Sequence, residues 1–174
     1  MFTQGRHFAP SDRLELLGAG SGYHEEFYSL LESSRIFNDL EWQEIETLST
    51  YMQAYHADRN VTLFHEGDGG DYMCLILDGQ VDILKEASDA EERIVSSVDR
   101  GKTLGEMSMV DGEPRSATAI TATPTTLAIL TRSNFNRLIQ EKPGLAVKIL
   151  FKVARLLSQR LRRTSGILVD YLEE

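Results

Sequence analysis

The residues between 103 and 118 combine the side-chain types that bind an anion, and they read TLGEMSMVDGEPRSAT. Gly105 has no side chain, so the backbone at this position can approach a ligand closely. Residues 106–109 can form one short helical turn, whose free backbone N–H groups would point at an anion. Arg115 adds a permanent positive charge with paired donors that match the oxygens of a phosphate group. The segment therefore predicts an anion-binding site.

Glu106 also lies in this segment, although a carboxylate repels an anion. Its presence fits a ligand that carries a hydroxyl group as well, such as a ribose, because a carboxylate accepts hydrogen bonds from hydroxyls. Ser116 adds a hydroxyl and a further backbone N–H next to Arg115. Taken singly, Arg115 could pair with nearby acidic residues, and Glu106 could cap a short helix. The occurrence of all these residues together favours the ligand-binding site.

The elements that must position this site are short strands. Apolar runs separated by turn residues occupy residues 60–130, which is typical of a β-sandwich or a β-barrel. We expect strands over 61–64, 73–77, 81–84, 94–98, 117–121 and 126–130. Asp78-Gly79 lies between two of these runs and favours the two positive φ angles of a type I′ hairpin turn. The polar residues 88–92 are expected to form the tip of a looser hairpin.

Helical spacing of apolar residues precedes and follows the strands. Before them we expect helices over 25–31 and 39–51, the second capped by Asp39. After them we expect a helix over 134–140 and a long helix that begins at Pro143, where the missing N–H group costs little. The apolar stripe of the second helix comprises Ile45, Leu48 and Met52. The stripe of the long helix comprises Ala146, Ile149, Leu150, Val153, Leu156, Leu157 and Leu161, and it continues after Gly166 as Ile167, Leu168, Tyr171 and Leu172.

The long helix has more apolar surface than the strands can cover, and such a face needs a partner. We therefore expect a homodimer in which two copies of this helix pair about a two-fold axis. At the other end of the chain, residues 1–23 are expected to form a flexible lead-in.

The net charge of −9 is unevenly distributed along the 174 residues. Residues 1–130 carry 9 basic and 23 acidic side chains, whereas residues 131–174 carry 9 basic and 4 acidic ones. The acidic part argues against a broad nucleic-acid-binding face there, and leaves the last helix as the basic surface.

Composition excludes several further classes of protein. Cys74 is the single cysteine, so an internal disulfide is excluded and a core position is expected. The longest uncharged apolar run, 72–77, is too short to span a membrane, and residues 1–10 show no secretory signal, so we expect a cytoplasmic protein. We also expect no metal, no cofactor and no catalytic residues, because metal-dependent β-barrel enzymes need convergent histidines. The four histidines are scattered along the chain at His7, His24, His56 and His65.

The segment 103–118 closely resembles the phosphate-binding cassette of the cyclic nucleotide-binding domain family. Residues 63–68 and 75–81 resemble the early barrel strands and turns of that family. Further along, Phe135, Leu138-Ile139-Gln140 and Pro143 are similar to the helices after the barrel in bacterial cyclic-AMP receptor regulators. The resemblance covers about residues 37–161. It implies a double-stranded β-helix, or jelly-roll, barrel flanked by N-terminal helices and a long C-terminal helix.

The resemblance implies one cyclic nucleotide-binding domain over 24–164, with its barrel at about 60–130 and its C-terminal helices at about 133–164. Residues 165–174 would form a tail or an extension of the helix. The implied function is that of a non-enzymatic sensor in signal transduction. Its ligand would be a cyclic nucleotide, with cAMP favoured and cGMP as the alternative, and binding would reposition the C-terminal helix.

The resemblance also assigns roles to individual residues. Arg115 would pair with the equatorial phosphate oxygens, and Ser116 and the backbone N–H of Ala117 would add bonds there. Glu106 would accept a hydrogen bond from the ribose 2′-hydroxyl. Members of the family cap the base from the last helix, and counting from Arg115 places the cap near Arg160 and Leu161, where Arg160 could stack on or hydrogen-bond a purine. The expected ligand-binding residues are Gly105, Glu106, Met107, Ser108, Arg115, Ser116, Ala117 and Arg160.

Two alternatives to a stand-alone sensor stay open. Many relatives are transcription regulators with a helix-turn-helix domain after the long helix, and this chain could be a truncated member of that type. Few residues follow Leu161, so we expect no specific DNA binding. The chain could also be a dimerising interaction module that has lost its ligand. The downstream protein partner cannot be read from the residues.

Overall fold

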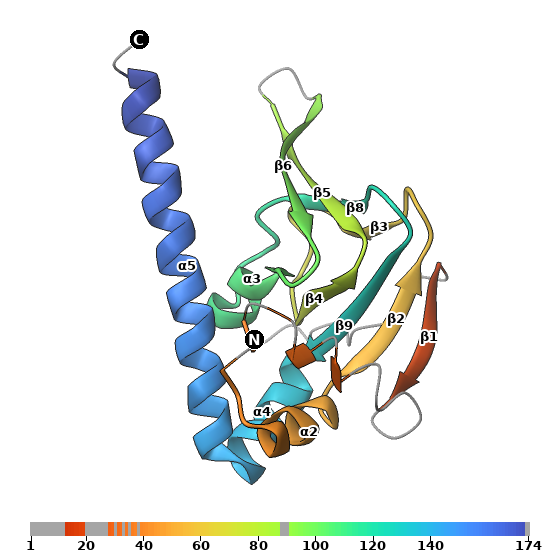
Figure 1. Ribbon diagram of the computed structural model, residues 1–174. Helices are drawn as coiled ribbons and strands as arrows, with labels where there is room; N and C mark the ends of the chain where they lie inside the picture. Colours follow the sequence, from red (N-terminus) through yellow and green to blue (C-terminus); the bar gives the residue numbers. More distant parts are fainter. Residues whose placement is uncertain are drawn as a thin grey trace, which may run out of the picture.

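Two antiparallel sheets form the centre of the computed structural model, and helices lie against one of them (Figure 1). The structure describes residues 13–19, 28–29, 31–32, 34, 36–37, 39–87 and 91–172. The five-stranded sheet has the order β1-β2-β9-β4-β7, with β1 Leu14–Ala19, β2 Gln53–Ala57, β9 Thr125–Thr131, β4 Tyr72–Asp78 and β7 Thr103–Leu104. The four-stranded sheet has the order β3-β8-β5-β6, with β3 Thr62–Phe64, β8 Thr118–Thr121, β5 Gln80–Glu86 and β6 Glu92–Asp99. The helices are α2 Trp42–Ser49, α3 Glu106–Asp111, α4 Arg132–Glu141 and α5 Pro143–Leu172.

Strand β4 separates two hydrophobic cores, because successive side chains of a strand point to opposite faces. One set, Tyr72, Cys74 and Ile76, packs between the two sheets. The other set, Met73, Leu75 and Leu77, packs against the helices. A continuous apolar run is what a strand covered on both faces requires. The two-sheet fold with flanking helices is therefore confirmed, although the sheets do not close into one continuous barrel.

The Asp78-Gly79 turn is not the hairpin that the sequence predicts. Strand β4 belongs to one sheet and β5 to the other, so the turn carries the chain between sheets. A type I′ turn needs two positive φ angles, and only Gly79 has one, at 90°. A Cβ atom at Gly79 would lie 2.4 Å from the carbonyl oxygen of Pro124, so the close approach of backbone explains the glycine. The hairpin that forms joins β5 to β6, and residues 88–90 of its expected tip lie outside the described residues.

The six predicted strands correspond to β3, β4, β5, β6, β8 and β9, whereas β1, β2 and β7 were missed. Strand β1 lies within the segment 1–23 that was expected to be flexible, and it pairs with β2. Its side chains are exposed or half-buried, so the sequence shows no clear buried face. Strand β7 has two residues, too few for alternation to be visible.

Helix α2 begins at Trp42, and the expected cap at Asp39 is wrong. The backbone N–H of Glu41 donates to the carboxylate of Glu44 at 3.1 Å, which is half of a capping box. Asp39 instead forms an ion pair with Lys152 of α5. The expected apolar stripe is confirmed, because Ile45, Leu48 and Met52 are all buried. Most of the helix expected over 25–31 lies outside the described residues.

The two C-terminal helices are confirmed, and α5 continues through Gly166 to Leu172 (Figure 1). Its first half is packed on the helical core through buried residues such as Ile149 and Val153. Further on, the predicted stripe leaves the core, and Leu161 is 69% exposed. Within the described part of the chain, none of the helices is both long enough and apolar enough to span a membrane.

Candidate functional site

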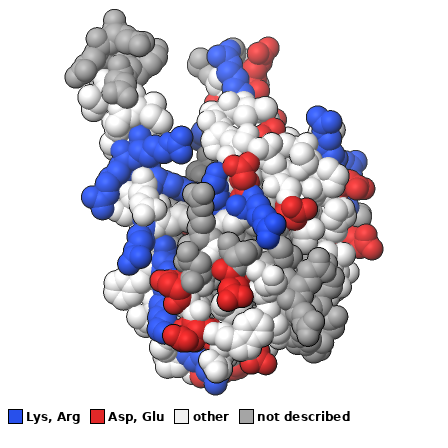
Figure 2. All heavy atoms as spheres, viewed as in Figure 1, with Lys and Arg blue, Asp and Glu red and all other residues white. Residues whose placement is uncertain are grey.

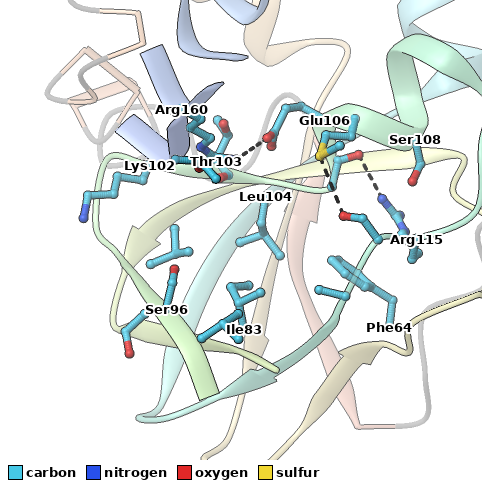
Figure 3. Close-up of a pocket in the computed structure, with 18 of the residues that line it drawn as sticks. Phe64, Ile83, Ser96, Lys102, Thr103, Leu104, Glu106, Ser108, Arg115 and Arg160 are labelled. Atoms are coloured by element: carbon cyan, nitrogen blue, oxygen red, sulfur yellow. Dashed lines mark hydrogen bonds and ion pairs between the residues drawn. The ribbon is translucent and has the colours of Figure 1, made fainter. Parts of the chain in front are cut away.

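A cavity of about 600 Å³ lies between strand β6, the segment 103–117 and helix α5. Its size falls within the range of small-molecule sites, about 300–1,000 Å³. All eight residues that the sequence singles out as ligand-binding line this cavity (Figure 3). Residues on α5 are brought to the cassette although they lie more than forty positions further along the chain, as Arg160 does when it bonds to Glu106.

Arg115 is almost completely buried, with 2% of its surface exposed. Its Nη1 donates to the carbonyl oxygen of Gly105 at 2.9 Å. The guanidinium carbon lies 4.2 Å from the ring centroid of Phe64 and 4.4 Å from that of Tyr72, so two aromatic rings hold the group in place. The Nε and Nη2 atoms are buried and have no hydrogen-bond partner among the described residues. Two unsatisfied charged donors at a cavity wall are what an anionic ligand would complete.

Glycines allow the segment to pack closely around this guanidinium. Gly105 has a φ of 77°, and a Cβ atom there would lie 2.4 Å from Nη1 of Arg115. Gly70, in the loop before β4, would place a Cβ atom 2.3 Å from the Cβ of Ser108. Arg132 supports both chain segments from the start of α4, since its Nη2 donates to the carbonyl oxygens of Gly70 and Ser108. The sequence analysis explained Gly105 but did not identify Gly70 or Arg132.

Glu106, the first residue of α3, is buried with 1% of its surface exposed. Its Oε1 accepts a hydrogen bond from Nη1 of Arg160, whereas its Oε2 is buried and has no partner among the described residues. Burial raises the pKa of the Glu106 carboxyl, and the positive charge of Arg160 opposes that rise. The hydroxyl of Thr103, on the neighbouring strand β7, is a second buried group without a partner in the described residues.

Arg160 lies on α5, and its Nη2 donates to the carbonyl oxygen of Thr103 at 2.6 Å. Its guanidinium is therefore anchored to the cassette through two of its N–H edges, which holds the side chain at the cavity. Leu161 does not line the cavity, but Thr164 and Ile167 do. Residues spaced by three, four and seven positions share one helix face, so the cavity-facing side of α5 extends from Arg160 toward Ile167. That periodicity is the signal that would have found Thr164, a small hydroxyl residue that counting from Arg115 missed.

The remaining predicted residues close the cassette around Arg115. The hydroxyl of Ser116 lies 3.7 Å from the sulfur of Met107. Ser108 is buried, and Met107 is 45% exposed at the cavity. Ala117 lines the cavity between Ser116 and strand β8.

The charges around the cavity are predominantly positive. Four basic side chains line it, and Glu106 is the single acidic one among the described lining residues; the basic ones are Lys102, Arg115, Arg160 and Arg163. Figure 2 shows Lys and Arg side chains gathered along the side of the molecule that α5 forms. A cavity of this charge raises the local concentration of anionic ligands. At the other end of α5 the basic face is neutralised, because Lys148 pairs with Glu44 at 2.5 Å.

The fold and the cavity define a two-sheet receptor domain for a small anionic molecule. The family model described as "Cyclic nucleotide-binding domain" matches residues 56–142. A cyclic nucleotide-binding domain from Methylobacillus flagellatus has a TM-score of 0.80 and 35% identity, and the match covers 91% of this chain and 89% of that one. The chain belongs to the cyclic nucleotide-binding domain family, as its cassette predicted.

Two further relatives are regulators. A CRP-like cAMP-activated global transcriptional regulator of Mycobacterium tuberculosis is 30% identical over 143 residues, which cover 82% of this chain and 62% of the regulator. The chain therefore spans about six tenths of that relative. The regulatory domain of Toxoplasma gondii PKA, crystallised with cAMP, has a TM-score of 0.59 and 30% identity, with 67% of this chain and 44% of that chain covered.

Proposed function

We propose that this chain is a cyclic nucleotide sensor and that its ligand is cAMP. The observation that carries the proposal is the buried guanidinium of Arg115, which has two unsatisfied donors at the wall of a cavity. A cyclic phosphodiester supplies one negative charge and the oxygen acceptors that these donors lack. Ser116 and Ala117 also line the cavity, and their backbone N–H groups would add bonds to the phosphate.

The sugar and the base have proposed positions that follow from the phosphate. Glu106 lies on the neighbouring turn, and its Oε2 would accept a hydrogen bond from the ribose 2′-hydroxyl. The base would extend between β6 and α5, where Val95 and Ile167 are apolar and Thr164 offers a hydroxyl. The names of the M. tuberculosis and T. gondii relatives both refer to cAMP, which supports adenine over guanine.

We further propose that ligand binding repositions α5 and that α5 pairs with its counterpart in a homodimer. Helix α5 contacts the sugar end of the site through Arg160, so it is the element best placed to respond. Beyond Arg160 the exposed apolar side chains that do not line the cavity include Leu161 and Val169, which are 69% and 53% exposed. Exposed apolar side chains on a helix are stabilised by a partner helix.

Calorimetric titration of the full chain with cAMP, cGMP and linear 5′-AMP tests the ligand. We expect cAMP to bind most tightly. Because a bound ligand stabilises the folded state by mass action, cAMP at 100 times its Kd should add about 2.7 kcal/mol to the free energy of unfolding. That gain corresponds to a rise in Tm of roughly 5–11 °C for a domain of this size.

The variants Arg115→Met and Arg115→Lys test the role of the guanidinium. Loss of one partner of a buried charged hydrogen bond costs about 2–5 kcal/mol, so Arg115→Met should weaken cAMP binding by roughly 30-fold or more. Arg115→Lys keeps the charge but lacks the paired donors, so it should restore only part of the affinity. The ligand-free Tm shows that each variant is folded. An unchanged cAMP affinity in a folded Arg115→Met protein contradicts the proposed site.

A further inference from the structure

Three of the four basic side chains that line the cavity have their charge compensated or buried. Nζ of Lys102 lies 2.9 Å from a carboxylate oxygen of Asp99, and Arg160 forms an ion pair with Glu106. Arg115 is 2% exposed, so its charge lies within the wall and acts on a ligand that has already entered. None of these three presents an uncompensated charge to the solvent.

Arg163 is the fourth basic residue of the cavity, and its situation differs. It lies on α5 three positions after Arg160 and is exposed. It has no hydrogen bond or ion pair with the residues that the structure describes. A residue that is exposed and also lines a cavity lies where that cavity opens to solvent. Arg163 therefore places an unpaired positive charge at the opening.

Most of the chain has the opposite charge. The net charge is −9, and residues 1–130 carry 23 acidic and only 9 basic side chains. Figure 2 shows both signs on the face in view, with Lys and Arg side chains gathered along α5. An anionic nucleotide is repelled by the net charge of such a molecule, whereas a local positive charge at a cavity attracts it and raises its rate of association. The position of Arg163 thus matters more than its contribution to the net charge.

The proposed position of the bound phosphate is on the other side of the cavity. Figure 3 shows Arg115 and Arg160 on opposite sides of the view, and Arg163 follows Arg160 on α5. A phosphate held by Arg115 is therefore away from the part of α5 that carries Arg163. The charge of Arg163 acts chiefly while the nucleotide approaches and enters.

We propose that Arg163 is an entrance residue that attracts the phosphate of the incoming nucleotide and sets its association rate, without contacting the phosphate in the bound state. This inference rests on the proposed function of the site as a cyclic nucleotide receptor. Charges at the rim of a binding site typically change the association rate and its dependence on salt, while contacts with the bound ligand change the dissociation rate.

The size of the effect follows from Coulomb's law in water. A unit charge about 7 Å from a passing phosphate, at an ionic strength of about 20 mM, changes the association rate by about 2- to 3-fold. Arg163→Gln should therefore associate about 2- to 3-fold more slowly than the wild type, and the charge reversal Arg163→Glu about 4- to 8-fold more slowly. At about 0.5 M salt the Debye length is shorter than this separation, so the differences should fall below about 1.3-fold.

Stopped-flow fluorescence with a C8-labelled fluorescent cAMP analogue measures association, and a chase with excess unlabelled cAMP measures dissociation. The forms of the full chain are the wild type, Arg163→Lys, Arg163→Gln, Arg163→Glu and Arg155→Glu. Arg155 is the matched control, because it is an exposed arginine of the same helix that does not line the cavity. It lies eight residues before Arg163, about 12 Å along the helix axis, and its reversal changes the net charge equally.

The expected pattern separates attraction from packing. Arg163→Lys keeps the charge and should associate as the wild type does, whereas the glutamine and glutamate variants should be progressively slower at low salt. Arg155→Glu should stay within about 1.5-fold of the wild type. Dissociation rates should be the same in all five forms within about 1.5-fold. A loss of packing would instead raise the dissociation rate at every salt concentration, and the ligand-free Tm shows that each variant is folded.

Each remaining outcome overturns a particular statement. Association rates that do not depend on the charge at position 163, or that fall equally in Arg155→Glu, overturn the role of Arg163 while the receptor proposal survives. A faster dissociation in Arg163→Gln that persists at 0.5 M salt also overturns it, because Arg163 would then be a contact of the bound ligand. Failure of the wild type to bind any cyclic nucleotide, or full binding by Arg115→Met, overturns the proposed function instead.

Discussion

Substitution of Gly105 by alanine should separate the backbone geometry of the cassette from its ligand chemistry. Gly105 has a φ of 77°, in the left-handed region that side chains other than glycine disfavour. A Cβ atom built on it would lie 2.4 Å from Nη1 of Arg115 and 3.2 Å from the carbonyl oxygen of Tyr72. The first distance is too short for a real contact, so the guanidinium must move.

Two costs are therefore expected in Gly105→Ala. Placing alanine in the left-handed region costs about 1–2 kcal/mol, which lowers the Tm by roughly 2–8 °C for a domain of this size. Displacement of the guanidinium breaks its 2.9 Å hydrogen bond to the Gly105 carbonyl oxygen and turns the free donors away from their present position. A misplaced charged donor costs about 1.5–3 kcal/mol of binding, or roughly 10- to 150-fold in cAMP affinity.

Gly112→Ala is the matched control, because Gly112 ends the same helix, α3, with a φ of 78° and has nothing within 4 Å of a built Cβ atom. It should lose Tm through its left-handed backbone alone, and therefore no more than Gly105→Ala, and it should keep its cAMP affinity. Thermal unfolding without ligand and calorimetric titration with cAMP measure the two quantities. Equal cAMP affinities in the two variants would refute the idea that close packing at Gly105 sets the position of Arg115.

Two further predictions concern single residues. Thr164→Val removes a hydroxyl at the cavity with almost no change of shape. It should weaken cAMP binding by about 2- to 10-fold in calorimetric titration, which is the size of one neutral hydrogen bond. Unchanged binding would show that the base does not reach this turn of α5. Cys74 is buried, and burial raises the pKa of its thiol to about 12. Its reaction with a thiol-specific chromogenic reagent at pH 8 should therefore be slow in the folded chain and fast in 6 M guanidinium chloride, and rapid labelling under native conditions would contradict this placement.

The sequence predicted the cassette well because its chemistry is local. Gly105, Glu106 and Arg115 lie within eleven positions, and the residue types alone indicate an anion and a hydroxyl. What the sequence could not supply are contacts between distant segments. The aromatic rings of Phe64 and Tyr72 that hold Arg115 come from β3 and β4. Their part in the site depends on how the two sheets face each other. The spacing of apolar residues along the chain does not show that packing.

The errors in the predicted fold have a similar origin. Asp78-Gly79 has the composition of a hairpin turn, but the strands on either side of it join different sheets. A hairpin turn within one sheet and a turn between two sheets have the same local sequence pattern, because both need a glycine with a positive φ. The cavity-lining residues Thr164 and Ile167 were missed for a related reason. Counting along a chain fixes a position on a helix but not the angle at which that helix crosses the cavity.

The proposed phosphate and sugar contacts reach α5 by two different routes. The sugar route is direct, since Glu106 accepts a hydrogen bond from Arg160. The phosphate route runs through Arg132, the first residue of α4, which donates to the Ser108 carbonyl oxygen of α3. Helix α4 is followed by α5 after a single residue. A ligand that shifted α3 would therefore act on the start of α4 and on the middle of α5. The free energy that drives the proposed movement of α5 can be no larger than the difference in ligand affinity between the two proposed positions of the helix.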